Sequence, residues 1–322
     1  MKVVSVINYK GGVGKTTLTA NLGAYAAMRG LRVLLIDLDP QTHLTFSFMA
    51  QEDWQRRYKD SKTLKNYFDS VLEPEKWGAV PLSSLLIRLN LRVSGRADLI
   101  ASSLELTDLD TNLSGSCGTG VTSNIFGNKL RIYNYLSKGI DELRGDYDLA
   151  LIDCPPNCNE SVKNALVASD YYLVPARMDY LSYLGVDNLE RSVRNFRKEY
   201  ADLRERRPDL RYGDFRAKML GIVPMMVAFT AGKMLKAHKE YMEELSREGY
   251  HIFPYLRDNA KTFSASRVEA GPVVLTPARY LSKAYAKSAL NKVVQDFYDI
   301  GNEFLSYMSD SNRPQSVNPL QF

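Results

Sequence analysis

The chain has 322 residues, of which 45% are hydrophobic and 25% charged, so it can bury a sizeable core as one large α/β domain. No apolar run approaches the ~20 residues that a membrane-spanning helix requires, which excludes an integral helical membrane protein, and we expect a cytoplasmic protein. The formal net charge is only +5, but residues 191–239 carry 13 Lys and Arg against 5 Asp and Glu. Their balance of 13 − 5 = +8 favours a polyanionic partner.

The three cysteines form neither a disulfide framework nor a metal-binding pattern. Cys154 and Cys158 are separated by three residues, two of them prolines, and Cys117 stands alone. The three histidines are scattered along the chain. We therefore interpret the cysteines as buried or incidental thiols rather than as ligands of a metal or cluster.

Short apolar runs rich in β-branched residues predict strands at five places. They lie at residues 2–8, 31–37, 149–153, 171–175 and 219–224. Helical patterns separate several of these runs, beginning with residues 16–29, which end at Gly30. This alternation predicts an α/β fold with a doubly wound, mostly parallel sheet that is flanked by helices on both faces.

Two further helices are predicted from the spacing of their apolar residues. The first presents Arg191, Arg194 and Lys198 on the face opposite an apolar stripe. That stripe consists of Val186, Leu189, Val193, Phe196, Tyr200 and Leu203. A long amphipathic helix near the carboxyl end is marked by Leu281, Tyr285, Ala289, Val293, Phe297, Ile300 and Phe304.

A glycine-rich segment joins the first predicted strand to the first predicted helix. In this setting backbone N–H groups and the helix amino terminus bind phosphate, the Lys15 ammonium contacts the β- and γ-phosphates, and the Thr16 hydroxyl binds Mg²⁺. The strict pattern GxxxxGK[ST] would need glycine at Tyr9, so this is a deviant P-loop with a second lysine, Lys10. The segment reads Lys10-Gly11-Gly12-Val13-Gly14-Lys15-Thr16-Thr17.

Acidic residues end two of the predicted strands. Asp37 and Asp39 lie where α/β sheets bind ligands, so one carboxylate could hold a magnesium-bound water and the other could orient the attacking water. Asp39 precedes Pro40, and this pair could equally be a helix cap or a turn. Asp153 ends the apolar strand at 149–153 and has the position of a Walker B acid.

In this order the three motifs resemble those of the ParA/MinD family of deviant Walker A ATPases, and most of all the ParA-type partition ATPases. The chain matches the patterns KGGVGKTT, DxDPQ and YDxxxID-x-PP nearly residue for residue. Weaker similarities lie at residues 172–175 and 270–273, whereas residues 255–259 match the family's IPRN motif only loosely. The spacing from Asp39 to Asp153 is longer than in compact members of the family.

From the resemblance we expect a single P-loop NTPase domain over residues 1–308. Residues 49–129 are interpreted as an insertion or elaboration within that domain, because they mix helical pieces with loop signals. Residues 309–322 are polar and rich in Pro and Asn, which predicts a flexible tail.

The resemblance also implies the cofactors and the site. The cofactors are ATP and Mg²⁺, with residues 10–17 binding the nucleotide. Thr16 binds Mg²⁺ directly and Thr17 lies at the phosphates, while Asp37 and Asp153 bind Mg²⁺ through water. The expected catalytic residues are Lys15, Asp39, which positions the nucleophilic water, and Lys10, which reaches the partner's ATP in a nucleotide-sandwich homodimer.

The implied function is slow ATP hydrolysis coupled to DNA segregation. The ATP-bound dimer would bind DNA without sequence preference and release it after hydrolysis stimulated by a ParB-like or adaptor protein, for plasmid or chromosome partition. Arg191, Arg194, Lys198 and Arg207 are the candidate DNA contacts, although a charged stripe on a helix can simply be solvated. If these residues bind DNA, the protein is nucleoid-associated.

Other functions stay open. A ParA-like ATPase can position another protein cargo or serve a mobile-element system, and the same fold carries metabolic enzymes and reductases. The cysteines do not suit the bridging cluster of such reductases. The tail lacks the basic amphipathic helix of the MinD branch, so no direct membrane binding is expected.

Overall fold

A computed structural model describes residues 1–117, 123–259, 271–275 and 284–309, without the side chains of residues 117, 123 and 284–288. The predicted tail, apart from Ser309, therefore lies outside the described residues. The same holds for Leu281, which was predicted to lie on the last helix, and for Ala270.

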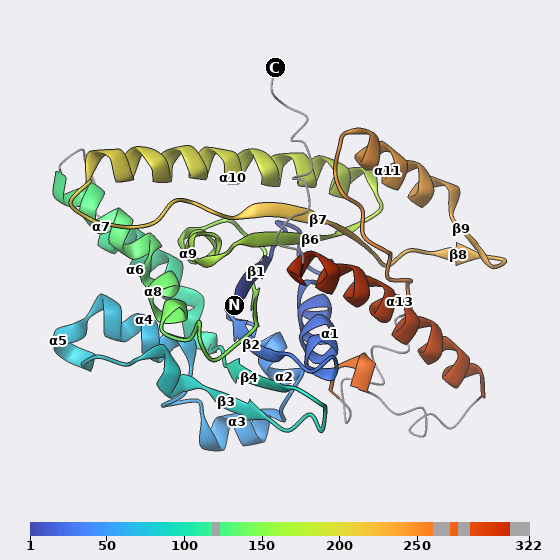
Figure 1. Ribbon diagram of the computed structural model, residues 1–322, viewed down its shortest axis with the longest axis horizontal. Helices are drawn as coiled ribbons and strands as arrows, with labels where there is room; N and C mark the ends of the chain where they lie inside the picture. The colour runs from blue at the N-terminus through green and yellow to red at the C-terminus, as the bar shows by residue number, and fades with distance from the viewer. Residues whose placement is uncertain (118–122, 260–270, 276–283, 310–322) are drawn as a thin grey trace.

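A sheet of seven strands forms the centre of the molecule, in the order β3-β4-β2-β5-β1-β6-β7 (Figure 1). All neighbouring strands are parallel except β3, which pairs antiparallel with β4 at one edge. The predicted doubly wound, mostly parallel fold is confirmed. The strands are β1 (Lys2–Val6), β2 (Arg32–Asp37), β3 (Ile87–Leu89), β4 (Arg96–Ile100), β5 (Leu149–Asp153), β6 (Tyr171–Arg177) and β7 (Lys218–Met225).

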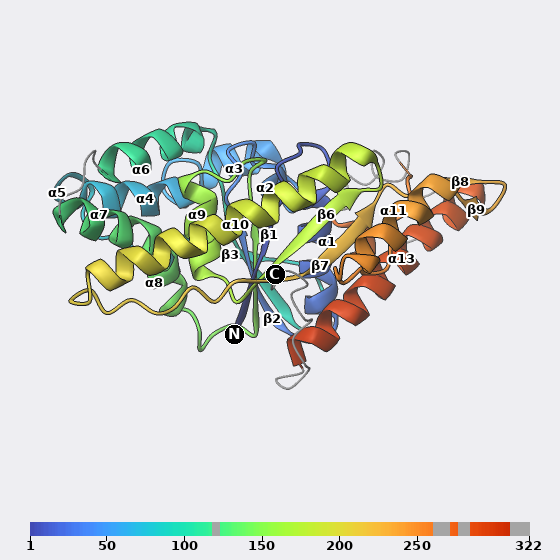
Figure 2. The same ribbon diagram turned by 90° about the horizontal axis from the view of Figure 1, so that it is seen from above.

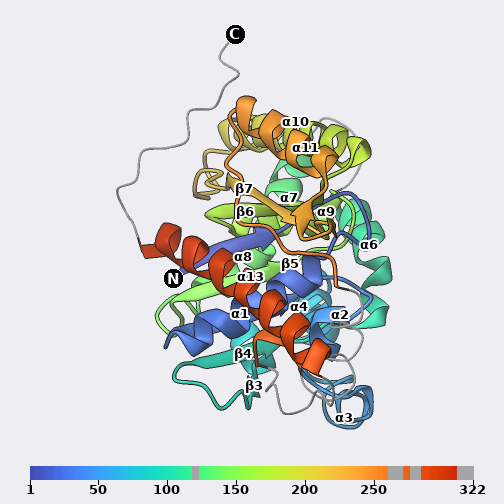
Figure 3. The same ribbon diagram turned by 90° about the vertical axis from the view of Figure 1, so that its right-hand side faces the viewer.

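Helices cover both faces of the sheet because successive strand residues point to opposite sides. In β2, Val33 and Leu35 pack with α1 (Lys15–Met28) and α13 (Ala284–Ser309). On the other face Leu34 and Ile36 join a core that includes residues of α10 (Tyr180–Arg206). Figures 1 and 3 show α10 on one side of β6 and β7, with α1 and α13 on the other.

The predicted helix stripes are present. All six apolar residues of the first stripe are buried on α10, and Val293, Phe297, Ile300 and Phe304 are buried on α13. Seen from above, α10 extends from beside β6 to the end of the molecule that holds α7 (Figure 2). The other α-helices are α2 (His43–Phe46), α3 (Gln51–Arg57), α4 (Leu64–Leu72), α5 (Pro74–Trp77), α6 (Leu109–Cys117), α7 (Ser123–Tyr133), α8 (Tyr135–Asp141), α9 (Glu160–Ala168) and α11 (Lys236–Arg247). Three 3-10 helices, η1 (Leu82–Leu85), η2 (Leu104–Asp108) and η3 (Val273–Leu275), and a hairpin of β8 (Phe229–Thr230) and β9 (Lys233–Met234) complete the described chain.

Residues 49–129, interpreted from sequence as an elaboration, supply two strands of the central sheet. The apolar pattern did not predict β4, because its five residues, RADLI, include two charges. Asp98 is nonetheless buried at 3% exposure, because its carboxylate accepts a hydrogen bond of 2.7 Å from the Tyr147 hydroxyl and pairs with Arg88. A charged residue can be buried in a central strand when it has hydrogen-bonding and charged partners. Such a strand lacks the continuous apolar run by which central strands are predicted.

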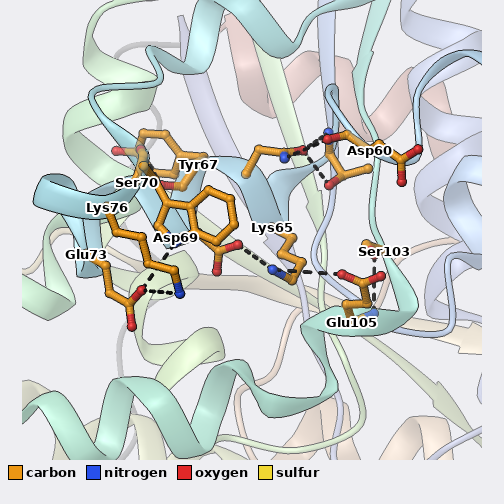
Figure 4. Close-up of polar contacts among 12 residues, drawn as sticks. Asp60, Lys65, Tyr67, Asp69, Ser70, Glu73, Lys76, Ser103 and Glu105 are labelled. Carbon is orange, nitrogen blue, oxygen red and sulfur yellow. Dashed lines mark hydrogen bonds and ion pairs between the residues drawn. The ribbon is translucent and has the colours of Figure 1, made fainter.

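A polar contact joins α4 to the segment that follows β4, and a separate ion pair lies at the start of α5 (Figure 4). Lys65 of α4 pairs with Asp69 one turn further on and lies 3.8 Å from a carboxylate oxygen of Glu105 in η2. Glu73 and Lys76 pair at 3.1 Å beside α5. The chain after β4 is therefore held by a neighbouring helix rather than by the glycine-rich loop.

Candidate nucleotide site

The glycine-rich segment forms the turn between β1 and α1. Gly12 and Gly14 have φ angles of 70° and 93°, in the left-handed region that favours glycine. Gly14 is the N-cap of α1, and no side chain of the described residues caps this end of the helix. The free N–H groups and the positive end of the helix dipole therefore suit an anion.

Lys15 folds back over this turn and is only 7% exposed. Its Nζ donates hydrogen bonds of 3.2 Å to the main-chain oxygens of Asn8 and Lys10. Burial lowers the pKa of Lys15, while the charges of Asp153 and Asp39 oppose that shift. The ammonium group thus lies inside the loop, where phosphate oxygens can replace the two carbonyl contacts.

Thr16 and Asp153 meet directly beneath the loop. The Thr16 hydroxyl donates a hydrogen bond of 2.6 Å to Asp153 Oδ2, and the Thr19 hydroxyl donates one of 3.3 Å to Oδ1. Asp153 is fully buried, and this burial raises its pKa to about 7, with the hydrogen bond from Thr16 acting in the opposite direction.

Asp37 lies beside Asp153, because the two residues are register partners at the carboxyl ends of β2 and β5. Burial and the Asp153 charge raise the pKa of Asp37 well above its usual range. Thr45 opposes this shift by donating to Asp37 Oδ2 from its N–H at 2.8 Å and from its hydroxyl at 2.7 Å. Asp39 accepts a hydrogen bond of 2.9 Å from the Gln41 N–H and is 7% exposed.

These side chains suit a Mg²⁺ ion that is bound at the same time as a nucleotide. Two desolvated carboxylates and a hydroxyl are hard oxygen donors. A divalent cation favours the charged form of both acids, whose pKa values are raised chiefly by burial and further by neighbouring carboxylates. The described residues contain no group of three or more His, Cys, Asp or Glu that could hold a metal by themselves. This is consistent with a cation that takes its other ligands from phosphate and water.

Lys10 lies at the rim of the site rather than inside it. Its Nζ is 3.2 and 3.3 Å from the two carboxylate oxygens of Asp179 and 3.4 Å from the Ser182 hydroxyl. The side chains of Lys10 and Asp179 are each 38% exposed. Asp179 also caps α10 by accepting a hydrogen bond of 2.8 Å from the Ser182 N–H. The second lysine of the loop is thus joined to the start of α10.

The remaining residues of the segment have different surroundings. Val13 is buried in the core, Thr17 is partly buried, and Gly11 is exposed. The structure therefore brings together Lys15, Thr16, Asp37, Asp39 and Asp153, with Lys10 beside them.

The candidate DNA contacts lie along α10 and just beyond it. Arg191 and Lys198 are exposed, and Arg194 is half-buried. Arg191 pairs with Asp187 at 2.6 Å, one turn earlier. In the described part of the chain, neither Arg194 nor Lys198 forms an ion pair.

Arg207, the fourth candidate DNA contact, is mostly buried rather than exposed. Its side chain is 15% exposed and lies against Gly127 of α7. Its guanidinium donates to both carboxylate oxygens of Asp209, at 2.7 and 2.5 Å. Packing against α7 therefore covers most of this candidate DNA contact.

Three residues in or beside the site were missed from sequence. Thr45 and Ser102 hydrogen-bond the acidic loop, and Thr19 hydrogen-bonds Asp153. Thr19 lies one helical turn after Lys15, a spacing that could have signalled it. No local pattern signals Ser102, because it follows a strand that the sequence analysis did not find.

Comparisons with known proteins agree with this geometry. Residues 1–205 match the model of the AAA_31 family, described as an AAA domain. The chromosome-partitioning ATPase Soj of Treponema pallidum is 30% identical over 194 residues, covering 60% of this chain and 64% of that protein. The chain spans between about half and two thirds of the first curated relatives it matches.

Two solved structures share the fold over nearly their whole length. Apo McdA of Cyanothece superposes with a TM-score of 0.65 at 19% identity, covering 95% of this chain and 99% of that one. The cobyrinic acid a,c-diamide synthase of Mycobacterium smegmatis, with a bound ATP analogue and magnesium, has a TM-score of 0.65 at 22% identity, covering 99% and 100%. At these identities the likeness concerns the fold alone.

The fold and the site define a P-loop NTPase with a deviant phosphate-binding loop. The chain belongs to the ParA/MinD family of such ATPases. In the described residues, no helix has the length and apolar character needed to cross a membrane.

A substitution at Asp37 tests the electrostatics of the site. In the nucleotide-free protein in EDTA, Asp37→Asn should raise the free energy of unfolding at pH 8 by about 1–3 kcal/mol. The folded state raises the pKa of this carboxyl, so stability is lost as pH rises above the unfolded value of the pKa. The gain should therefore shrink to well under about 1 kcal/mol near pH 4, where the folded-state carboxyl is protonated and the unfolded-state one is about half protonated. Urea unfolding at the two pH values measures it.

The exposed Glu52→Gln variant is the control and should change stability at neither pH. An Asp37→Asn protein that is less stable than the wild type at pH 8 would show that the carboxylate is not a net cost to the fold.

Proposed function

We propose that this protein is a Mg²⁺-dependent ATPase with slow intrinsic turnover that acts in DNA partition. It dimerises with ATP, binds DNA without sequence preference, and releases the DNA after hydrolysis stimulated by a ParB-like or adaptor protein. The resemblance to partition ATPases and the similarity to the chromosome-partitioning ATPase Soj of Treponema pallidum support this proposal.

One observation carries the proposal. Five polar residues from three separate motifs converge at the carboxyl edge of the sheet, beneath a loop suited to phosphate. Phosphoryl transfer depends on positioning and on stabilising charge, and this edge supplies both. Bound Mg²⁺ would help to neutralise the phosphates.

Each residue has a role in this proposal. Lys15 and the loop N–H groups bind the phosphates, and Thr16, Asp37 and Asp153 hold Mg²⁺, the two acids through water. Asp39 orients the attacking water. Lys10 reaches across the dimer to the partner's nucleotide.

Two substitutions separate binding from turnover. Lys15→Ala should weaken ATP binding at least about tenfold, because it removes the buried cation of the loop. Asp39→Ala should bind ATP like the wild type and lose at least about 90% of turnover, because only the attacking water loses its partner. A fluorescent ATP analogue measures binding, and phosphate release measures turnover. A Lys15→Ala protein with wild-type turnover would refute the site assignment.

The proposed role of Lys10 is tested by measuring the oligomeric state of the protein. Asp39→Ala with ATP should sediment as a dimer, and adding Lys10→Ala should weaken that dimer about tenfold, because the cation no longer meets the partner's phosphates. Lys59→Ala removes an exposed lysine that follows α3 and should have no effect. A double variant that dimerises like Asp39→Ala would remove Lys10 from the interface.

DNA binding depends on which basic residues are free of ion pairs with acidic residues. Arg206 pairs with Asp202 at 2.8 Å and Arg216 lies 3.6 Å from Asp170, so much of the positive charge of residues 191–239 already has acidic neighbours. Arg194 and Lys198, which form no ion pair in the described residues, are the first candidates for phosphate contacts, and the exposed Arg191 remains a third. The paired charges favour a second candidate function, in which the same ATPase positions a protein cargo or serves a mobile-element system.

Charge reversal decides between the two functions. With ATP, Glu at Arg191, Arg194 and Lys198 should weaken binding to unrelated duplexes at least about tenfold and flatten the salt dependence, because fewer counterions are released. ATP binding should not change. Glu at Arg56, Arg57 and Lys59, which are exposed, alters net charge equally and is the control. Wild-type protein that binds no duplex with ATP at low salt would favour the cargo function.

A further inference from the structure

Asp37 and Asp39 are joined to the end of β4 by a closed ring of hydrogen bonds. The Thr45 hydroxyl donates to Asp37 Oδ2 at 2.7 Å and accepts from the Ser102 N–H at 3.1 Å. The Ser102 hydroxyl donates to the main-chain oxygen of Asp39 at 2.7 Å. The Asp39 N–H, at 3.3 Å from Asp37 Oδ1, closes the ring.

This ring is almost entirely buried. Asp37, Thr45 and Ser102 have no exposed surface, and Asp39 is 7% exposed. A hydrogen bond in such surroundings is costly to break, because no water replaces the lost partner. Loss of either hydroxyl should therefore let the acidic loop move relative to the sheet.

The support for Ser102 comes from outside the phosphate-binding loop. Its neighbour Ala101 accepts a hydrogen bond of 2.8 Å from the Leu64 N–H at the start of α4. Ser103 caps η2 by accepting a hydrogen bond of 3.2 Å from the Glu105 N–H, and Lys65 lies beside the Glu105 carboxylate (Figure 4). Residues 49–129 thus reach Asp39 directly through Ser102, and Asp37 through Ser102 and Thr45.

We propose that Thr45 and Ser102 are positioning residues for phosphoryl transfer, with Thr45 holding Asp37 and Ser102 holding Asp39. This inference rests on the proposed ATPase function. Thr45 fixes the carboxylate that faces Mg²⁺, so it acts on Mg²⁺-dependent nucleotide binding. Ser102 holds the backbone of the residue that orients water, so it acts on turnover. We call this pair the acid clamp.

Thr45 is tested by nucleotide binding rather than by activity. The affinity for a fluorescent ATP analogue is measured in EDTA and in Mg²⁺. Thr45→Val keeps the shape of the side chain and removes its hydroxyl, so the gain in affinity on adding Mg²⁺ should fall at least about tenfold, with affinity in EDTA unchanged. Thr45→Ser restores the hydroxyl and should keep most of the gain.

Ser102 is tested by steady-state kinetics. Ser102→Ala should lower kcat about tenfold and leave KM for ATP within about twofold, because only the placement of Asp39 changes. Ser70→Ala is the matched control. Ser70 is also a buried serine, at 3% exposure, and its hydroxyl donates to the Tyr67 main-chain oxygen at 2.8 Å, on α4. It should leave kcat unchanged, and urea unfolding confirms that both variants are folded.

The outcomes separate this inference from the proposed function. If Mg²⁺ adds nothing to nucleotide affinity in the wild type, the proposed function fails and the acid clamp fails with it. If the wild type shows the gain and Thr45→Val keeps it, or if Ser102→Ala turns over like the wild type, the clamp alone fails. An equal loss of kcat in Ser70→Ala would also overturn it, since general loosening would then explain both.

Discussion

The rest of the site depends on two carboxylates that the sheet buries side by side. Asp37 and Asp153 end adjacent parallel strands in register, so their side chains share one desolvated edge. The electrostatic cost is visible in the raised pKa of both groups, and it is only partly offset by hydroxyl donors such as Thr16 and Thr45. A fold that keeps this arrangement without bound cation gives up stability for a site in which a cation and a phosphate are favoured.

The ion pair between Lys10 and Asp179 connects the glycine-rich loop to α10. Nucleotide binding is proposed for the loop and DNA binding for the helix. Asp179 holds Lys10 and caps a helix of 27 residues, about 40 Å long, on which Arg191, Arg194 and Lys198 lie. The helix packs along its length through one apolar stripe, so it can move only as a unit with its neighbours. The rim of the nucleotide site and the basic face are therefore joined through the first residues of α10.

The stretch between Asp39 and Asp153 is more closely integrated than its sequence indicates. It contributes β3 and β4 to the sheet and carries Ser102 to the acidic loop. Its charged residues are structural here: Asp98 is buried by Tyr147 and Arg88, and Lys65 joins α4 to η2. A reading that weighs only apolar periodicity assigns such residues to loops, because partners far along the chain neutralise them.

The sequence by itself determined the parts of this protein whose physics is local. Glycines at left-handed positions, a lysine and threonine at a helix start, and acids at the ends of apolar strands are short-range patterns, and they identified the loop, the acids and the parallel α/β fold. Only the tertiary structure decided which distant groups meet. It joined Lys10 to Asp179, covered Arg207 with α7, and brought Ser102 to Asp39 across 63 residues, because such contacts arise from packing between elements that carry no shared local signal.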